Sequence, residues 1–521
     1  MQYPYENLEN FTIGALWQRS LGMYSKNPSL AWVGEEAMSY EKMGAKIDAM
    51  KALLKANGIH KGDKVLLLSE NMPHWGVAYI SITSLGAVVV PVLPDFHPAE
   101  VHHILRHSEA KAVFVSSKYQ STIEDAPSSD VEFVINLDTL TLLEDISNKS
   151  YLSQFKQKMK EKMHKHDASK VDEEDLCAII YTSGTTGHSK GVMLTHKNIV
   201  TNAMSSHSVL EITSQDTFLS VLPLAHTFEC TVGLIVPLLH GSSVYYVAKT
   251  PTPSVLLKAF ELVRPTMMLS VPLIIEKIYK NKVLAKFNSS FLTKNLYKIA
   301  FFRKQLNKIA GKKLLETFGG RLRFFGIGGA ALSPFVEQFL LEADFPYVVG
   351  YGLTETAPLL AGTPLEKTKK LKSTGPAMYG VTLMIKDADV HGEGEICAKS
   401  PSVMRGYYKD EEKTKEVFDE DGWFLTGDLG YIDEDGYLFI SGRSKNVIIS
   451  ASGENIYPEQ IESVINQDEL VADALVMEMD GKVVARVYFE QELLDEKLNA
   501  LHIADSQAPK EIQKLLDSKL E

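Results

Sequence analysis

One stretch of the chain combines glycine, hydroxyl and lysine side chains closely enough to bind an anion. It runs from Tyr181 to Gly191, between an apolar, strand-like lead-in at residues 178–180 and a second β-prone run at residues 192–194. A loop of this composition between two strands leaves backbone N–H groups unpaired, and its hydroxyls and lysine add donors suited to phosphate oxygens. The residues expected to hold a triphosphate are Thr182, Ser183, Gly184, Thr185, Thr186, Gly187 and Lys190.

This loop differs from a Walker A loop, in which the lysine follows a glycine and the loop opens a helix. Here Ser189 precedes Lys190, and a strand is expected on both sides of the loop. Clusters of glycine, serine and threonine are often ordinary turns, but eleven residues in this order are more specific than a short cluster. We therefore expect a nucleotide site of a different type.

A second group of reactive side chains follows the strand expected at residues 347–349. The next seven residues read GYGLTET and bring Tyr351, Thr354 and Glu355 close together in the sequence. An aromatic ring can stack on a nucleobase, a hydroxyl can donate to a phosphate, and a carboxylate can hold the magnesium ion that accompanies a triphosphate.

Three further stretches carry polar or small side chains beside expected strands or turns. His226 follows the strand at residues 217–221, within the run LPLAHTFE, and ligands usually bind at such strand ends. The small residues at 329–331 end another strand, where they let a flat ring approach the backbone. Asp428 follows a glycine and suits a carboxylate that accepts hydrogen bonds from two ribose hydroxyls.

Together these stretches resemble the motifs of the adenylate-forming, or AMP-binding, superfamily, which comprises acyl-CoA synthetases, luciferases and adenylation domains of peptide synthetases. The resemblance covers nearly the whole chain after about Leu30, and the LPLAHTFE run is similar to the form typical of the long-chain fatty acyl branch. Besides the loop residues, it implies an ATP site made of Gly329, Ala330, Ala331, Tyr351, Gly352, Thr354, Asp428 and Arg443.

The resemblance also implies individual roles. The residues implied to be catalytic are Lys190, Thr354, Glu355 and His226, with Glu355 as the Mg²⁺ ligand. His226 and Phe228 would border the acyl pocket and the thiol channel, with His226 as a pocket residue first and a base only as an added hypothesis. Lys445 would be the inter-domain hinge, and the turn at Gly453 would lie beside the pantetheine tunnel.

The activity implied is ATP-dependent activation of a fatty acid to an acyl-adenylate, followed by transfer to coenzyme A, which gives acyl-CoA, AMP and pyrophosphate. The LPLAHTFE run favours a long-chain acid, but sequence order gives no pocket depth. Two alternatives stay open. One is an enzyme that loads the phosphopantetheine of a carrier protein, and the other is a non-catalytic relative that binds acyl groups or nucleotides.

The order of expected elements predicts an α/β fold. Helices and strands alternate, and Ser39 is expected to cap the first helix of this series. The expected elements are a helix at 39–57, a strand at 65–68, a helix at 75–85, a strand at 87–92, a helix at 98–107 and a strand at 112–115. Such alternation predicts a parallel sheet with covering helices.

The resemblance implies a division of the chain into two domains. Residues 1–442 would form a large nucleotide- and acyl-binding domain of parallel or mixed sheets with covering helices and a β subdomain. Residues 443–445 would be the hinge, and residues 446–521 a small α+β domain that is incomplete.

Length and charge agree with an enzyme that acts on small molecules. The 521 residues exceed what one core can hold, and a net charge of −12 argues against a general nucleic-acid partner. Three cysteines without metal-ligand spacing favour a reducing, cytoplasmic location, and neither a secretory signal nor an apolar run of about 20 residues is recognisable. The oligomeric state is not indicated.

Two basic segments contrast with the negative net charge. Residues 151–170 are rich in lysine with apolar residues at every fourth position, and residues 276–323 carry thirteen Lys or Arg and two Glu. Such segments can contact an anionic membrane peripherally. They can equally be the solvated sides of amphipathic helices, and the sequence leaves both interpretations open.

The sequence departs from the family pattern in two places. Ile449 stands where parts of the superfamily have a lysine, six positions after the hinge arginine. The expected P-x-x-G-K loop, whose lysine contacts the acyl carboxylate and the α-phosphate, is not recognisable before the last residue, Glu521, and Lys510 lacks the right context.

We therefore predict that this chain adenylates weakly and that a version extended by a few tens of residues is active. Loss of one preorganised charge donor typically costs about 3 to 4 kcal/mol, or roughly 10² to 10³ in rate. Pyrophosphate release by the two versions, compared with the same acid, is the measurement. Equal rates would show the expectation to be wrong.

Overall fold

The structure is a computed structural model. It describes residues 5–6, 8–126, 130–143, 170–182, 189–449, 455–495 apart from positions 467, 469, 480, 481 and 492, and residue 512. The loop residues Ser183, Gly184, Thr185, Thr186 and Gly187 lie outside the described residues, as do Gly453, the first basic segment except Lys170, and the C-terminal stretch with Lys510.

An eight-stranded sheet contains β7 and β8, the two strands on either side of the loop expected to bind a triphosphate. We call this loop the phosphate loop and the two strands the phosphate-loop hairpin. Its central strands are parallel, and antiparallel pairs occur at β7/β8, β8/β18 and β5/β6. In sheet order the strands are β18 (Gly406–Tyr407), β8 (Lys190–Thr195), β7 (Leu176–Thr182), β3 (Val88–Val92), β2 (Lys64–Leu68), β4 (Ala112–Val115), β5 (Phe133–Asn136) and β6 (Thr141–Leu142).

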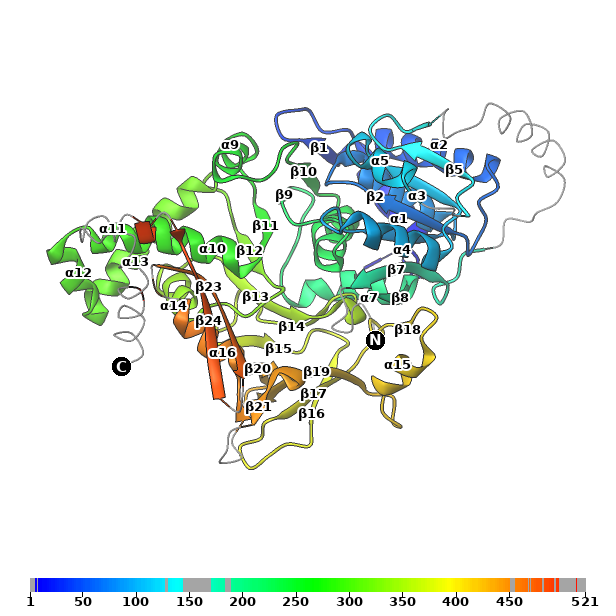
Figure 1. The fold of residues 1–521 in the computed structure, drawn as a ribbon. Helices are drawn as coiled ribbons and strands as arrows, with labels where there is room; N and C mark the ends of the chain where they lie inside the picture. Colours follow the sequence, from blue (N-terminus) through cyan, green and yellow to red (C-terminus); the bar gives the residue numbers. More distant parts are fainter. Residues whose placement is uncertain are drawn as a thin grey trace. The chain divides into compact units, whose positions relative to one another are not determined.

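The central strands of this sheet are apolar along their length because helices cover both faces. Val65 and Leu67 of β2 belong to one core cluster with α3 (Pro73–Ser84), whereas Leu66 and Leu68 belong to another with α4 (Pro98–Ser108). Continuous apolar strands are typical of parallel sheets buried in this way. Figure 1 shows these strands and helices in blue and cyan.

The expected helix at residues 39–57 is confirmed as α2 (Tyr40–Ala56). Ser39 caps it, since its Oγ accepts a hydrogen bond from the backbone N–H of Lys42 at 3.2 Å. The expected apolar face is buried and consists of Met43, Ile47, Met50 and Leu54. The bounds of β2, α3, β3, α4 and β4 also lie within two residues of those expected.

A seven-stranded sheet brings several strand ends to one edge. All its neighbouring pairs are parallel except β13/β14. In sheet order the strands are β1 (Leu30–Trp32), β10 (Ser243–Tyr246), β9 (Thr217–Ser220), β11 (Met267–Ser270), β12 (Phe324–Ile327), β13 (Tyr347–Gly352) and β14 (Leu359–Gly362). Ligands of α/β proteins usually bind beyond the carboxyl ends of such strands.

The remaining helices surround these two sheets or connect their strands. None of the helices in the described part of the chain has the length and hydropathy needed to cross a bilayer. They are α1 (Ile13–Tyr24), α5 (Gln120–Glu124), α7 (His196–Ser205), α8 (Val236–His240), α9 (Pro253–Val263), α10 (Pro272–Ile278), α11 (Ala285–Asn288), α12 (Phe291–Tyr297), α13 (Ala300–Thr317), α14 (Pro334–Glu342) and α15 (Glu411–Glu416).

Short helical turns complete these connections. Two are π-helices, η3 (Glu229–Ile235) and η4 (Tyr279–Leu284), and four are 3₁₀ turns. The 3₁₀ turns among the described residues are η1 (Ser117–Tyr119), η2 (Ser206–Ser208), η5 (Thr354–Thr356) and η6 (Ser444–Asn446).

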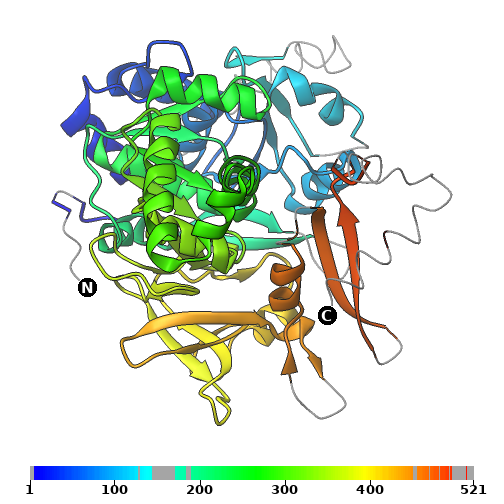
Figure 2. The same ribbon diagram turned by 90° about the vertical axis from the view of Figure 1, so that its left-hand side faces the viewer.

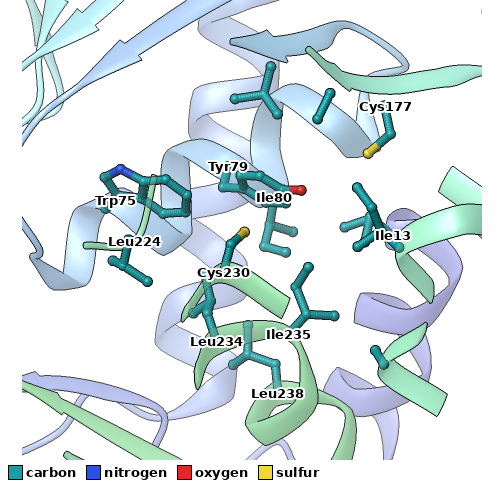
Figure 3. Close-up of a cluster of buried hydrophobic side chains, with 14 of the residues drawn as sticks. Ile13, Trp75, Tyr79, Ile80, Cys177, Leu224, Cys230, Leu234, Ile235 and Leu238 are labelled. Atoms are coloured by element: carbon teal, nitrogen blue, oxygen red, sulfur yellow. The ribbon is translucent and has the colours of Figure 1, made fainter. Parts of the chain in front are cut away.

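The largest core cluster lies around α3. The rings of Trp75 and Tyr79 stack with their centroids 5.3 Å apart, and the Tyr79 hydroxyl forms hydrogen bonds with the thiols of Cys177 and Cys230 (Figure 3). Leu234 of the π-helix η3 belongs to the same cluster. The segment that follows the LPLAHTFE run is therefore fixed in the protein interior.

The chain divides into two compact units. The first comprises residues 1–384, 397–426 and 432–439, and the second comprises residues 385–396, 427–431 and 440–521. A five-stranded sheet has the order β15 (Ser373–Pro376), β20 (Tyr437–Arg443), β19 (Phe424–Ile432), β17 (Gly394–Lys399) and β16 (Thr382–Lys386). The boundary between the two units passes through β20, β19, β17 and β16 of this sheet. The hinge expected at residues 443–445 stays a prediction.

The second unit also contains two small sheets and a helix. The hairpins pair β21 (Ile448–Ile449) with β22 (Asn455–Ile456), and β23 (Val471–Met479) with β24 (Lys482–Phe489). Helix α16 (Pro458–Ile465) begins at the proline that the sequence places there. Figure 2 shows β23 and β24 as two long neighbouring arrows in orange and red.

Two helical glycines are predicted to respond in opposite ways to alanine. A Cβ at Gly311 of α13 would lie 2.6 Å from the Cβ of Ala343, whereas a Cβ at Gly22 of α1 would meet open space. Gly311→Ala should lower the free energy of unfolding by about 1 to 3 kcal/mol through overpacking. Gly22→Ala should raise it by up to about 1 kcal/mol because alanine favours the helix. Denaturant unfolding measures both, and a shift in the same direction would contradict the packing described.

Candidate functional site

The phosphate-loop hairpin ends at Lys190. Thr182 of β7 pairs with Lys190 of β8, so the two ends of the loop meet across the antiparallel ladder. Both residues are partly exposed. Gly191 allows the close approach of Ile179 on β7 and of Tyr408 directly after β18, since a Cβ there would lie 2.9 Å from Ile179 Cγ2 and 3.3 Å from Tyr408 Cβ. The described ends of the loop are therefore held by strand pairing.

Tyr407 links Lys190 to Glu355. The Lys190 ammonium lies 5.0 Å from the centroid of the Tyr407 ring, and the Tyr407 hydroxyl donates to Glu355 Oε1 at 2.9 Å. Burial and the Glu355 charge raise the pKa of Tyr407, so its hydroxyl stays a donor. The structure thus brings together a cation and a carboxylate that the sequence separates by 165 positions, since 355 − 190 = 165.

Glu355 lies in the short turn η5, which neighbouring side chains hold in place. The amide of Asn202 on α7 donates to the carbonyls of Thr356 at 3.2 Å and Leu359 at 2.8 Å. The Thr231 hydroxyl donates to the carbonyl of Ala357 at 3.1 Å. These neutral hydrogen bonds fix the backbone that carries Thr354 and Glu355, both of which are partly exposed.

Gly352 is required by the same turn. A Cβ at this position would lie 2.0 Å from the carbonyl oxygen of Pro358, so no side chain fits. Tyr351 precedes it on β13 and is only 7% exposed. Stacking of Tyr351 on adenine therefore stays a prediction.

The His226 turn is held by an asparagine that sequence analysis did not single out. Asn71 donates to the Leu222 carbonyl at 2.6 Å and accepts from the Leu224 N–H at 2.8 Å. His226 Nδ1 accepts from the Phe228 N–H at 3.3 Å. The His226 side chain is exposed, yet nearby protein atoms displace part of its water and lower its pKa, which favours the neutral ring.

Phe228 meets the small-residue turn after β12. A Cβ at Gly328 would lie 3.2 Å from the Phe228 ring and 3.7 Å from the Gly350 carbonyl oxygen. Three stretches singled out in the sequence, around residues 226, 329 and 351, therefore come together at the edge of the seven-stranded sheet. Gly329, Ala330 and Ala331 are all exposed there.

Glu229 is a buried carboxyl directly after Phe228. It is 1% exposed, forms a hydrogen bond with Ser220, and its Oε2 has no partner among the described residues. Gly233 leaves room for it, since a Cβ there would lie 2.7 Å from Glu229 Oε1. Burial raises the pKa of Glu229 to about 8. Tyr246 and Cys230 are the titratable neighbours.

In the second unit, Asp428 and Arg443 lie side by side. Arg443 Nε is 3.3 Å from Asp428 Oδ1, and the carboxylate is buried while the arginine is exposed. Gly427 makes the turn with φ of +72°, and its N–H donates to Glu395 at 3.1 Å. Both residues expected at the ribose are thus neighbours. Lys445 lies exposed in η6.

The described residues offer carboxylates for a metal ion but no preformed cage. The described residues contain no group of three or more His, Cys, Asp or Glu that could hold a metal ion. Magnesium usually keeps several waters and binds through one or two carboxylates plus substrate phosphates. Glu355 beside Lys190 fits that kind of site and not an all-protein cage.

Tyr407, Asn71 and Glu229 are the residues that sequence reasoning missed. Tyr407 belongs to the run MRGYY at residues 404–408, and its aromatic type at a strand edge was the only signal. Asn71 binds backbone groups and Glu229 is buried, so the position of neither residue in the sequence indicates a site.

The chain matches one family model. Residues 17–408 match the model described as AMP-binding enzyme, which is about three quarters of the chain. The match includes the phosphate loop, the His226 turn, Glu355 and Tyr407, and it stops before Asp428.

Curated relatives are similar over most of their length. Long chain acyl-CoA synthetase 7, peroxisomal, from Arabidopsis thaliana is 31% identical over 503 residues, which is 89% of this chain and 70% of the relative. Long-chain-fatty-acid–CoA ligase heimdall from Drosophila melanogaster is 30% identical over 500 residues, or 88% of this chain and 73% of the relative. These names describe the relatives.

Solved structures share the fold. The crystal structure of ATP-bound MatB from Rhodopseudomonas palustris has a TM-score of 0.72 and 25% identity, and the match covers 92% of this chain and 89% of that chain. The α/β fold with mixed sheets expected from the sequence is therefore confirmed.

The buried Glu229 predicts a stability change with pH. Between about pH 4.5 and about pH 8 the folded protein holds a proton that the unfolded chain has released. The free energy of unfolding should therefore fall as pH rises, by up to about 1.4 kcal/mol per pH unit. Glu229→Gln cannot ionise and should lose less stability over this range. Unfolding midpoints of both proteins across these pH values measure the difference.

Glu412→Gln on exposed α15 is the matched control and should follow the wild type. Parallel pH profiles for the wild type and Glu229→Gln would contradict a neutral, buried Glu229.

Proposed function

Because this chain belongs to the AMP-binding enzyme family, we propose that it activates a long-chain fatty acid with ATP and transfers the acyl group to coenzyme A. It is an acid–thiol ligase, an AMP-forming acyl-CoA synthetase, and its products are acyl-CoA, AMP and pyrophosphate. The observation that carries the assignment of the site is the contact of Tyr407 with both Lys190 and Glu355.

In the first step the fatty acid carboxylate attacks the α-phosphorus of ATP. A bond forms between a carboxylate oxygen and phosphorus, and the bond from phosphorus to the pyrophosphate oxygen breaks. Lys190 and the backbone of the loop would offset the negative charge of the triphosphate and of the departing pyrophosphate. Thr354 would donate to the α-phosphate.

Glu355 would hold Mg²⁺ together with triphosphate oxygens, and the ion would supply further charge neutralisation when bound. The Tyr407 hydroxyl keeps the Glu355 carboxylate in place. It also limits which oxygens of this carboxylate can turn toward a ligand.

The nucleoside would use two sets of residues, a small-residue turn for the base and an acidic and basic pair for the ribose. Gly329, Ala330 and Ala331 are exposed beyond β12, so a flat base can approach their backbone. Asp428 would accept from the ribose hydroxyls, and its neighbour Arg443 would add a donor. Tyr351 and Gly352 would contribute further contacts to the nucleotide.

In the second step the coenzyme A thiol attacks the carbonyl carbon of the acyl-adenylate. A carbon–sulfur bond forms, the thiol proton is released to water, and AMP leaves with the electrons of the carbon–oxygen bond. We place His226 and Phe228 beside this carbonyl, because the turn exposes His226 and packs Phe228 against Gly328. Rotation about Lys445 would exchange the two faces of the small domain, with the Gly453 turn facing the thiol.

Transfer to a carrier protein is the alternative that the sequence left open. The relatives are named as an acyl-CoA synthetase and a fatty-acid–CoA ligase, and these names favour the free thiol of coenzyme A. A non-catalytic role is not supported either, since the relatives are named as enzymes.

We propose a reducing location such as the cytoplasm, with peripheral contact to a membrane as the source of the acid. Cys177, Cys230 and Cys397 are all buried free thiols. Burial raises the pKa of Cys230 to about 12, so this thiol stays protonated and unreactive. None of these three cysteines forms a disulfide in the structure.

The proposal predicts that AMP formation rises along a series of acids from acetate to oleate. AMP formation is measured with each acid in the presence of coenzyme A or of a holo-carrier protein. We expect oleate and coenzyme A to give the highest rates. A maximum at a short acid would overturn the chain length, and a preference for the carrier would overturn the acceptor.

A further measurement separates the transfer step from the adenylation step. Synthetic oleoyl-adenylate with coenzyme A reports the transfer alone, so weak adenylation cannot hide it.

The variant Tyr407→Phe tests the hydrogen bond to Glu355, because it removes one oxygen and keeps the ring beside Lys190. It should slow AMP formation by about 10- to 100-fold, because hydrogen bonds to charged groups contribute about 1.5 to 3 kcal/mol. Tyr408→Phe is the matched control.

A further inference from the structure

Apolar side chains are exposed at the end of the first unit formed by α11, α12 and α13. The exposed fractions are 85% for Phe291, 68% for Leu292, 52% for Ile299 and 67% for Phe301, and Phe302 is also exposed. Figure 2 faces this end, where the green helices lie in front. We call these five residues with Lys294, Lys298 and Lys304 the basic-apolar face.

These residues lie on α12 and α13 or in the turn between them, and both helices are anchored. The Tyr297 hydroxyl donates to Asn307 Oδ1 at 3.0 Å, and the Tyr297 ring packs on Phe287 with centroids 4.8 Å apart. Asn307 is fully buried and donates to Glu342 at 2.8 Å. Arg303 pairs with the same carboxylate at 2.8 Å. The inward positions of α12 and α13 are thus occupied, and the aromatic residues of the face point outward as a consequence.

The surrounding charge is strongly positive. Residues 276–323 carry thirteen Lys or Arg and two Glu in a protein whose net charge is −12. Arg303, Lys308 and Arg323 form ion pairs with Glu342, Asp344 and Asp216, respectively. Lys294, Lys298 and Lys304 are exposed, and each lies within three positions of an exposed apolar residue in the sequence.

A solvated helix face does not account for this arrangement, because its outward positions would be polar. A second copy of the chain is also disfavoured, since two such faces would bring like charges together. Apolar and aromatic residues flanked by lysines are typical of helices that lie in the interface of an anionic membrane.

We propose that the basic-apolar face docks the protein on an anionic lipid surface, with Phe291, Leu292 and Phe301 inserted among the headgroups and acyl chains. Lys294, Lys298 and Lys304 then lie near the lipid phosphates. The biological purpose of docking rests on the proposed function, because docking would give the enzyme access to a fatty acid that partitions into lipid. Docking itself requires no catalysis and is measured without substrates.

The test is co-sedimentation of the full chain with vesicles of phosphatidylcholine alone or mixed with phosphatidylglycerol, at low and high salt. We expect binding to the mixed vesicles at low salt. The double variant Lys294→Glu with Lys298→Glu should weaken it by more than tenfold, since each lysine near the surface contributes about fivefold. Phe291→Ser with Phe301→Ser should weaken it by roughly tenfold or more.

The matched controls change the same residue types elsewhere. Lys42→Glu with Lys55→Glu reverses two exposed charges on α2, and Met23→Ser removes an exposed apolar side chain on α1. Both should bind as the wild type does, and the unfolding midpoint of every variant verifies that it folds. Absence of binding to the mixed vesicles at low salt, or equal loss in the controls, would overturn the proposal.

Immobilised polyglutamate distinguishes a lipid from an acidic protein. Binding to polyglutamate and vesicles that is lost in the lysine variant but kept in the phenylalanine variant would identify an acidic protein partner and overturn the lipid assignment. A protein that docks but forms no oleoyl-CoA from oleoyl-adenylate would instead contradict only the proposed function.

Discussion

The parallel order of β9, β11, β12 and β13 determines where the candidate site residues of the first unit come together. Because these strands run in the same direction, the turns that follow β9, β12 and β13 emerge at one edge. They carry His226 and Phe228, the small residues 329–331, and the turn with Glu355. No long-range ion pair is needed to gather them, since the sheet register already does so.

Close backbone packing is the second requirement of this edge. Gly328 lies against the Phe228 ring, and Gly352 lies against the carbonyl of Pro358. A Cβ at Gly352 would clash with the Pro358 backbone, whereas a Cβ at Gly328 would require a small shift of the Phe228 ring. The glycines of these motifs are therefore explained by packing within the protein, and contact with a nucleotide is an additional demand on the same residues.

Much of the fold could be predicted from local patterns. Ser39 and the apolar positions 43, 47, 50 and 54 define α2 because capping and helical periodicity are properties of neighbouring residues. The alternation that follows indicated the parallel sheet for the same reason. The pairing of β18 with β8 could not be foreseen, because two residues carry it and their partners lie more than 200 positions earlier.

The site was predictable only where motifs resemble those of a family. Lys190 and Glu355 were singled out, and the structure brings both to Tyr407. Asn71 and Glu229 were missed because their effect arises from burial and from backbone hydrogen bonds. Nothing in the type or spacing of a single asparagine or glutamate reveals that it is enclosed.

The double contact of Tyr407 makes Lys190 and Glu355 thermodynamically coupled positions. A change at either one alters the packing or the hydrogen bond of the ring that the other one also touches. Free-energy changes of substitutions at residues that share a partner are generally not additive. Tolerance to variation at Lys190 should therefore depend on the residue present at position 355, and the reverse should hold as well.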